Sequence, residues 1–193
     1  MNLHPELTDA ADAGGRVVAG VRPGQFGDPT PDTEWDVRTL LNHLVLWTAY
    51  NFERRAHGEM VPEEMMTRDF AADPDFAAAY RAQLDRALDA WADPAVWEKD
   101  LNVMGSATPA ADIAAMMLAE LVLHGWDLAA ATGQSYTVSD RAAAAALAAV
   151  EANAEMFRQY KGFAEPVSLP DDGAALDRAL ALSGRDPGWT PSR

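Results

Sequence analysis

Apolar residues recur at helical spacing along most of the chain, and Pro, Gly or Asp separates one apolar stretch from the next. No segment of any length shows the alternation of apolar and polar residues that is typical of a strand. The pattern therefore predicts an all-α protein, a bundle of four or five helices that forms a single domain over residues 1–193. The predicted helices span residues 5–21, 35–56, 113–133 and 140–157. A further helix is capped by Asp73-Pro74, carries apolar residues from Phe76 to Trp91 and stops at Asp93-Pro94, and a short helix lies near 174–182.

The apolar stretch over residues 113–133 is the centre of this pattern. It follows Pro109, which suits the first turn of a helix, and it ends at Gly133, which can adopt the left-handed conformation of a helix end. Glu120 and His124 are four residues apart, so their side chains leave the same face of the helix about one turn apart. Leucine and valine surround both. A carboxylate and an imidazole in such a setting need a polar partner, and a metal ion is one such partner.

The helix predicted at 35–56 supplies a third candidate residue. His43 lies on the shoulder of its core-facing stripe, so we expect the ring to be at least partly buried. Together, His43, Glu120 and His124 would form a three-ligand site for a divalent metal ion, with one position left open for water or substrate. The alternative interpretation is that both histidines are ordinary core residues and that Glu120 pairs with an arginine. Spacing alone does not decide between the two.

A second pair with the same spacing, Glu53 and His57, acts as an internal control. It lies beside Arg54, Arg55 and Gly58 at the predicted end of a helix. Solvent can satisfy polar groups there, so this pair is not predicted to be a site. The difference between the two pairs is the apolar setting of residues 120 and 124.

Four further residues each have more than one interpretation. Asp127 lies on the same helix face as His124, where it could orient a ligand imidazole, provide a fourth oxygen ligand, or simply be a solvated acid near a helix end. Trp47 and Trp126 could wall a substrate pocket or belong to the core. Arg38 could receive an anionic substrate or pair with Glu34 on the surface.

Composition excludes several classes of function. Thirty acidic against 15 basic residues give a formal net charge of −15, which disfavours nucleic-acid and membrane-surface partners. The absence of cysteine excludes a disulfide scaffold and a cysteine nucleophile, so any reactive thiol would have to arrive on a substrate. No apolar run approaches the roughly 18 residues of a membrane span, and the N-terminal residues lack a signal-peptide pattern. We therefore expect a cytoplasmic protein.

Two stretches resemble the signatures of a known family. Residues 29–44, PTPDTEWDVRTLLNHL, resemble the opening signature of actinobacterial metal-binding proteins related to the N-terminal domain of mycothiol-dependent maleylpyruvate isomerase, in the DinB/YfiT-like superfamily. Residues 119–129, AELVLHGWDLA, resemble the second signature, and residues 176–189 are similar to the C-terminal end of the family. The resemblance implies a DinB-like four-helix bundle with an additional short C-terminal helix, and it implies a homodimer.

The resemblance implies that the metal ligands of that family fall on His43, Glu120 and His124. A site with mixed imidazole and carboxylate ligands suits zinc, or else nickel. Two features depart from the pattern. Asp32 stands where the first signature often has cysteine. In addition, the residues after about position 160 are too few to build the extra C-terminal domain that contributes to the isomerase active site, which argues against isomerase activity.

The leading functional hypothesis is a metal-dependent thiol-S-transferase. In this hypothesis the metal binds the thiolate of a small thiol such as mycothiol, lowers its pKa and presents it to an electrophilic substrate. A metal-dependent hydrolase would use the same open position. The alternatives are a noncatalytic metal- or small-molecule-binding helical dimer and a structural dimer with a vestigial site. An open position lined by a pocket would favour an enzyme.

Overall fold

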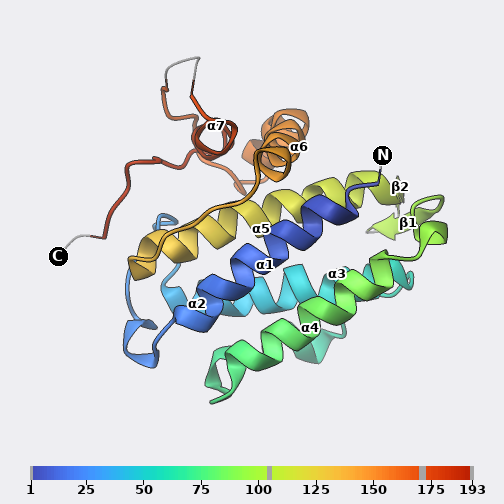
Figure 1. The fold of residues 1–193 in the computed structure, drawn as a ribbon, viewed down its shortest axis with the longest axis horizontal. Helices are drawn as coiled ribbons and strands as arrows, with labels where there is room; N and C mark the ends of the chain where they lie inside the picture. The colour runs from blue at the N-terminus through green and yellow to red at the C-terminus, as the bar shows by residue number, and fades with distance from the viewer. Residues whose placement is uncertain (1, 104–105, 170–172, 192–193) are drawn as a thin grey trace.

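A computed structural model describes residues 2–103, 106–169 and 173–191 of the chain. It confirms an all-α architecture with one small β-hairpin (Figure 1). In chain order the elements are α1 (His4–Gly20), α2 (Val37–His43), a π-helical segment (Leu44–Asn51), α3 (Phe52–Ala56), α4 (Phe76–Trp91), β1 (Asp100–Val103), β2 (Ser106–Pro109), α5 (Ala110–Thr132), α6 (Asp140–Gln159) and α7 (Ala175–Leu182). Short 3₁₀ turns lie in several of the connections.

Four helical rods form the bundle. The first is α1, the second is the continuous run from α2 through the π-helical segment to α3, the third is α4 and the fourth is α5. α1 packs against both α4 and α5, α3 packs against α4, and α2 packs against α5. Figure 1 shows α1 and α5 side by side, with α2, α3 and α4 beneath them. This arrangement brings the end of α2 next to the middle of α5.

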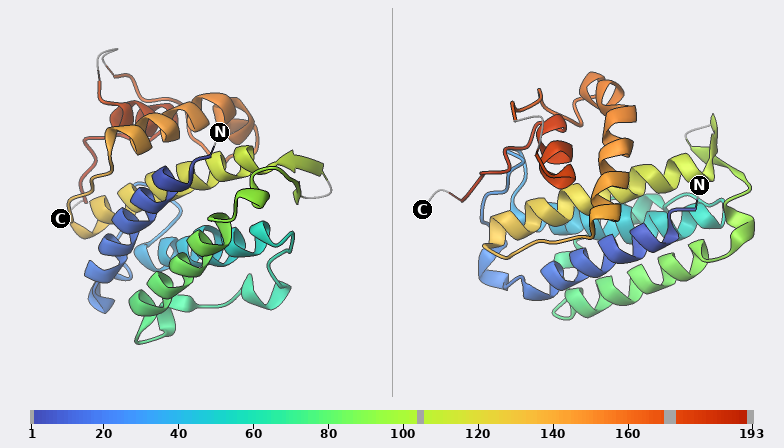
Figure 2. Two further views of the ribbon diagram at one scale, coloured as in Figure 1. Left: turned by 45° about the vertical axis from the view of Figure 1, so that its right-hand side comes forward. Right: turned by 45° about the horizontal axis from the view of Figure 1, so that its top comes forward.

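α5 lies between two apolar clusters. Leu118 and Leu121 belong to the main core of the bundle, whereas Ala119 and Leu123 belong to a second cluster shared with α6 and α7. Figure 2 shows α6 and α7 together on the side of α5 that faces away from α4. A helix buried on two sides needs apolar residues around most of its circumference, which explains why α5 carries so few charges.

This burial also corrects an expectation from the sequence. α5 is long and apolar enough to pass the length and composition test for a membrane span, although no run of that length was expected. However, 67% of its most apolar window is buried inside the fold. Its composition is therefore that of a core helix in a soluble bundle.

The hairpin was also not expected. β1 and β2 pair antiparallel, with Asp100 opposite Pro109 and Leu101 opposite Thr108. Each strand has four residues, which is too short for an alternating pattern to stand out in the sequence. The pairing places residue 109 directly before α5, which consequently begins at Ala110, three residues before the predicted start.

The helix predicted at 35–56 begins later than expected and is not α-helical throughout. Asp36 caps it, because its carboxylate accepts a hydrogen bond from the backbone N–H of Thr39 at 2.8 Å. Trp35 therefore precedes the helix instead of belonging to it. In contrast, α5 ends as predicted, at Gly133 with φ of +69°.

Candidate metal centre

Three polar side chains converge where α2 meets α5. His43 is the last residue of α2, and Glu120 and His124 lie one turn apart on α5. The Oε2 atom of Glu120 is 3.0 Å from His43 Nε2 and 3.3 Å from His124 Nε2. One ligand atom from each residue lies within 4.8 Å of the others. The structure thus brings together the three residues singled out in the sequence, and Glu120 pairs with the two histidines rather than with an arginine.

Trp35 covers the two imidazoles. Its ring centroid lies 4.6 Å from that of His43 and 5.5 Å from that of His124, where the two rings are stacked. This position follows from the cap at Asp36, which starts α2 after the tryptophan and leaves Trp35 in the preceding turn. Trp35 was not predicted to be a site residue, although its place directly before the capping aspartate was a usable signal.

Asp127 orients His124. Its Oδ2 atom lies 3.0 Å from His124 Nδ1, and its side chain is almost fully buried. Arg185 holds the same carboxylate through two charge-assisted hydrogen bonds of 2.8 Å, from Nε to Oδ1 and from Nη2 to Oδ2. Because Asp127 occupies Nδ1 of His124, the Nε2 atom is the one that faces Glu120. This contact corresponds to the orienting role considered for Asp127.

Arg185 is a second site residue that was not predicted from the sequence. It lies 58 positions after Asp127, directly behind α7. The chain reaches the site through Gly184, whose φ of +87° is unfavourable for residues with a side chain. A Cβ atom at this glycine would also lie 2.6 Å from the Cβ of Ala164. In the sequence, the available signal for this contact was the adjacent pair Gly184 and Arg185 in the C-terminal stretch.

The electrostatics of the cluster keep its two acids ionised. Burial raises the pKa of Glu120, but the two neighbouring histidines reverse this and keep the pKa well below its usual range. Burial lowers the pKa of His124, whereas Glu120 and Asp127 raise it to about 9. Burial lowers the pKa of His43. At Asp127, burial is outweighed by the charge of Arg185, which lowers the pKa of the carboxyl. Two ionised carboxylates therefore lie within a largely buried cluster.

The distances fit a metal ion with mixed nitrogen and oxygen ligands. A tetrahedral ion with bonds of about 2.0–2.2 Å has its ligand atoms about 3.3–3.6 Å apart. The observed separations of 3.0 and 3.3 Å are close to this spacing, so small side-chain rotations would make room for the ion. Three protein ligands leave a fourth position open, as in catalytic zinc sites. His43, Glu120 and His124 could therefore hold a divalent metal.

A pocket of about 240 Å³ adjoins the cluster. Trp47 lines it, in agreement with one of the two interpretations of this residue, whereas Trp126 packs against the second apolar cluster. The pocket lies between the α2–α3 rod, α5 and α6. Its lining residues are His43, Trp47, Asn51, Arg55, Ile113, Met116, Met117, Glu120 and Phe157.

Other sequence candidates lie outside the cluster. Arg38 donates to the carboxylate of Asp69, with Nε 3.1 Å from Oδ2, and this pair replaces the contact with Glu34 that the sequence suggested. Glu53 accepts a hydrogen bond from a glutamine of α4, and His57 is exposed behind α3. The second Glu-His pair is thus a surface feature of the helix end, as predicted.

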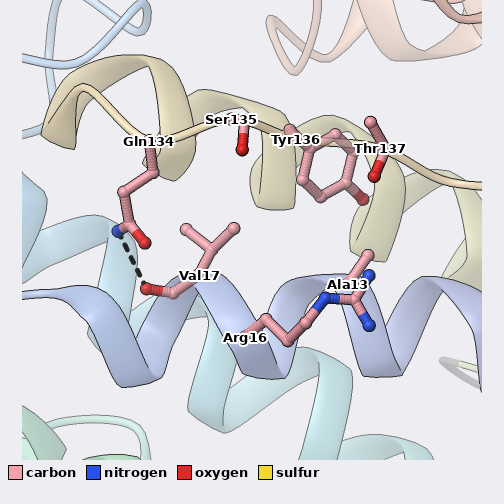
Figure 3. Close-up of a pocket in the computed structure, with 7 residues that line it drawn as sticks. All are labelled: Ala13, Arg16, Val17, Gln134, Ser135, Tyr136 and Thr137. Atoms are coloured by element: carbon pink, nitrogen blue, oxygen red, sulfur yellow. Dashed lines mark hydrogen bonds between the residues drawn. The ribbon is translucent and has the colours of Figure 1, made fainter.

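A larger groove lies elsewhere on the molecule. It has a volume of about 340 Å³ and runs between α1 and the segment after α5 (Figure 3). Gln134 closes one end by donating to the carbonyl of Val17 at 3.0 Å. Among the described residues that line the groove, Arg16 is the only one with a formal charge. The groove therefore lacks the converging ligand atoms found between α2 and α5.

Comparison with protein families places this chain. The model for the mycothiol maleylpyruvate isomerase N-terminal domain matches residues 7–129. The chain belongs to this family. The matched span contains His43, Glu120, His124 and Asp127, and it ends before α6, α7 and Arg185. The family confirms the DinB-like helical fold predicted from the two signatures.

Two relatives extend the similarity beyond the matched span. They are uncharacterized proteins of Mycobacterium tuberculosis, from strains CDC 1551 and H37Rv. Each is 30% identical over 181 residues, which cover 91% of this chain and 93% of the relative. The similarity therefore extends beyond residue 129 and includes α6. No solved structure gives a significant match to the chain.

Proposed function

We propose that this protein is a cytoplasmic metal-dependent thiol-S-transferase that uses a small thiol such as mycothiol. The observation that carries the proposal is the convergence of the ligand atoms of His43, Glu120 and His124 beside an open pocket. Membership in a mycothiol-related family supports the choice of thiol. The same pocket favours an enzyme over a closed, purely structural metal site, because a substrate can approach the open position.

Each residue of the cluster has a distinct part in the proposed chemistry. Glu120 supplies the negative charge that favours a cation, and the histidines supply nitrogen ligands. Asp127 keeps Nε2 of His124 directed toward Glu120 through its contact with Nδ1. A bound Zn²⁺ would lower the pKa of a thiol at the open position, so that the thiol reacts as thiolate.

The pocket would hold the electrophile. Its apolar walls, which include Trp47 and Met117, exclude water from one side of the reacting carbon. The thiol loses its proton to solvent, and its sulfur forms a bond to the electrophilic carbon. The bond from that carbon to the leaving group breaks at the same time, and the leaving group departs with the electron pair.

Elemental analysis of untagged protein tests the metal site. We expect about one metal ion per chain in the parent protein, since three ligands on two packed helices make a specific site. His43→Ala and His124→Ala should each lose the ion. His57→Ala is the matched control, because this histidine follows a glutamate at the same spacing but is exposed. Metal retained in both cluster variants would refute the ligand assignment.

Thiol transfer is tested separately on the metal-loaded protein. Mycothiol and a chromogenic aryl chloride, which releases chloride when the sulfur attacks, report the reaction. We expect acceleration by the parent and by His57→Ala, and no acceleration by His43→Ala or His124→Ala. A fully loaded parent without activity toward any thiol would instead indicate a noncatalytic metal-binding protein.

A further inference from the structure

Four side chains of one helical rod line the pocket beside the metal centre. His43, Trp47, Asn51 and Arg55 follow one another at intervals of four residues, and all four line the same pocket. In an α-helix each step of four residues turns by about 40°, so the fourth member would lie about 120° from the first. The π-helical segment at Leu44–Asn51 has more than four residues per turn. A step of four residues there falls short of a full turn, so it rotates the side chain in the opposite sense to a step in an α-helix. The segment thereby keeps the four side chains on one face.

Arg55 contributes a buried positive charge to this pocket. It is only 8% exposed, and its Nη1 atom donates to the backbone carbonyl of Asn102 at 2.7 Å. In the described part of the chain, no carboxylate lies within ion-pair distance of it. The neighbouring acids have other partners, since Glu59 pairs with Arg54 and Glu53 pairs with α4.

This charge persists at neutral pH. Burial lowers the pKa of Arg55, but a guanidinium keeps its proton in proteins. A buried charge without a counterion is costly, so a ligand of opposite charge that pairs with it would be favoured there. Arg55 is therefore a candidate anion-binding group.

Asn51 carries the second unsatisfied group. It lies one turn closer to the metal centre and is 4% exposed. Its Oδ1 atom is buried and has no hydrogen-bond partner among the described residues. Because nearly all buried polar atoms in folded proteins are paired, this atom also indicates a missing partner. Asn51 and Arg55 face the same pocket, so one ligand can satisfy both.

We propose that the pocket is an acid-binding site in which Arg55 pairs with the carboxylate of a small ligand and Asn51 accepts a hydrogen bond from a neighbouring group of that ligand. Trp47, Met116 and Met117 contact its apolar body. The volume of about 240 Å³ is below the roughly 300–1,000 Å³ of drug-sized pockets, which limits the ligand to a small molecule. The statement that this ligand is a substrate rests on the proposed function. Binding of the ligand itself requires no metal ion.

The test measures binding to the metal-free protein by calorimetry. The probes are 4-phenylbutyrate and 4-phenylbutyramide, which have nearly the same size but differ by one negative charge. We expect the acid to bind about tenfold more tightly than the amide, as for a charge-assisted contact inside a pocket. Arg55→Gln should abolish this preference, and Asn51→Leu should weaken the binding of the acid several-fold.

Arg54→Gln is the matched control. It removes the same charge from the adjacent residue, whose side chain is 33% exposed and paired with Glu59, so the preference for the acid should remain. Arg55→Lys keeps a positive charge and should retain part of the preference, which guards against a folding defect in Arg55→Gln. Equal binding of acid and amide by the parent, or an unchanged preference in a folded Arg55→Gln variant, would overturn the proposal.

The outcomes separate this proposal from the metal site. Arg55→Gln should keep the full metal content, because Arg55 is three turns from His43 along the rod. If the parent holds no metal but still prefers the acid, the acid-binding site stands and the thiol transferase fails. When the metal-loaded protein catalyses thiol transfer, Arg55→Gln should raise KM for the reactant that carries the carboxylate. This result shows whether the acidic reactant is the electrophile or the thiol.

Discussion

Asp127 makes two interactions at once. It receives the Nδ1–H of His124 on one side and the guanidinium of Arg185 on the other, and its side chain is only 1% exposed. A carboxylate behind a histidine is a common second contact in metal sites, where it fixes the tautomer and orientation of the ring. Here a residue of the C-terminal segment fixes the carboxylate in turn. The orientation of His124 therefore depends on a residue 61 positions away.

Substitution of Asp127 by asparagine should affect both stability and metal affinity. Asp127→Asn leaves the Arg185 guanidinium buried without its counterion, so we expect the free energy of unfolding to fall by about 3–5 kcal/mol in urea denaturation. Metal affinity, measured by competition with a chelator, should fall about 10–100-fold because the His124 ring loses its orienting carboxylate.

The control for this prediction is Asp85→Asn. Asp85 also pairs with an arginine, Arg81, but both side chains are about half exposed. Loss of this pair should cost less than about 1 kcal/mol and leave metal affinity unchanged. Similar losses of stability in Asp127→Asn and Asp85→Asn would show that the buried pair contributes no more than a surface pair.

At the scale of elements, α5 could be predicted from the sequence because its signals are local. Its end at Gly133, its apolar composition and the spacing of Glu120 and His124 all lie within one continuous stretch. The pairing of α5 with His43 came from the family signatures, since nothing in either helix alone specifies the other.

The features missed by the sequence analysis have long-range causes. The π-helical segment has the composition of an ordinary apolar helix, and its extra backbone turn shows only in the structure. Trp35 became a site residue because the cap falls on Asp36, one of several acceptable caps nearby. Arg185 reaches the site because α7 packs on α6, a contact with no periodic signature in the sequence.

The close packing of α5 against the following segment gives a prediction about Gly125. A Cβ atom at this position would lie 2.8 Å from the ring of Tyr136, whose hydroxyl donates to the backbone carbonyl of Leu121. Gly125→Ala should therefore lower stability by about 1–3 kcal/mol through overpacking, which exceeds the gain in helix propensity of about 1 kcal/mol. Thermal unfolding followed by circular dichroism measures the change.

Gly15→Ala provides the matched comparison inside α1. The nearest atom to a Cβ there is a flexible part of Arg81 at 3.6 Å, which is ordinary van der Waals contact. Only the propensity effect remains, so this variant should gain about 0.5–1 kcal/mol. Stabilisation by both alanines would mean that Tyr136 moves aside without loss.

At the scale of the whole molecule, α5 connects two parts. On one side it closes the bundle with α1 and α2, and on the other it supports α6 and α7, which bring Arg185 to the site. The metal centre lies where these parts meet and draws residues from both. The homodimer implied by the family resemblance stays a prediction.

A metal ion at this centre should stabilise the whole fold. His43 and Glu120 are 77 residues apart in sequence, so an ion held by both ties α2 to α5 and binds only the folded chain. At free zinc about 100 times Kd, mass action adds about 2.7 kcal/mol. For a chain of this size, this corresponds to a rise in Tm of roughly 5–11 °C. Thermal scans with and without zinc, reversed by EDTA, measure the shift.

The histidine variants decide where that stabilisation originates. The chain carries a net charge of −15, so weakly bound zinc on surface carboxylates could also raise Tm. Surface binding would act equally on the parent, His57→Ala and His43→Ala, because none of these substitutions changes an acidic residue. Binding at the centre predicts the full shift in the parent and in His57→Ala and none in His43→Ala or His124→Ala. A shift that persists in His43→Ala would place the ion outside the cluster between α2 and α5.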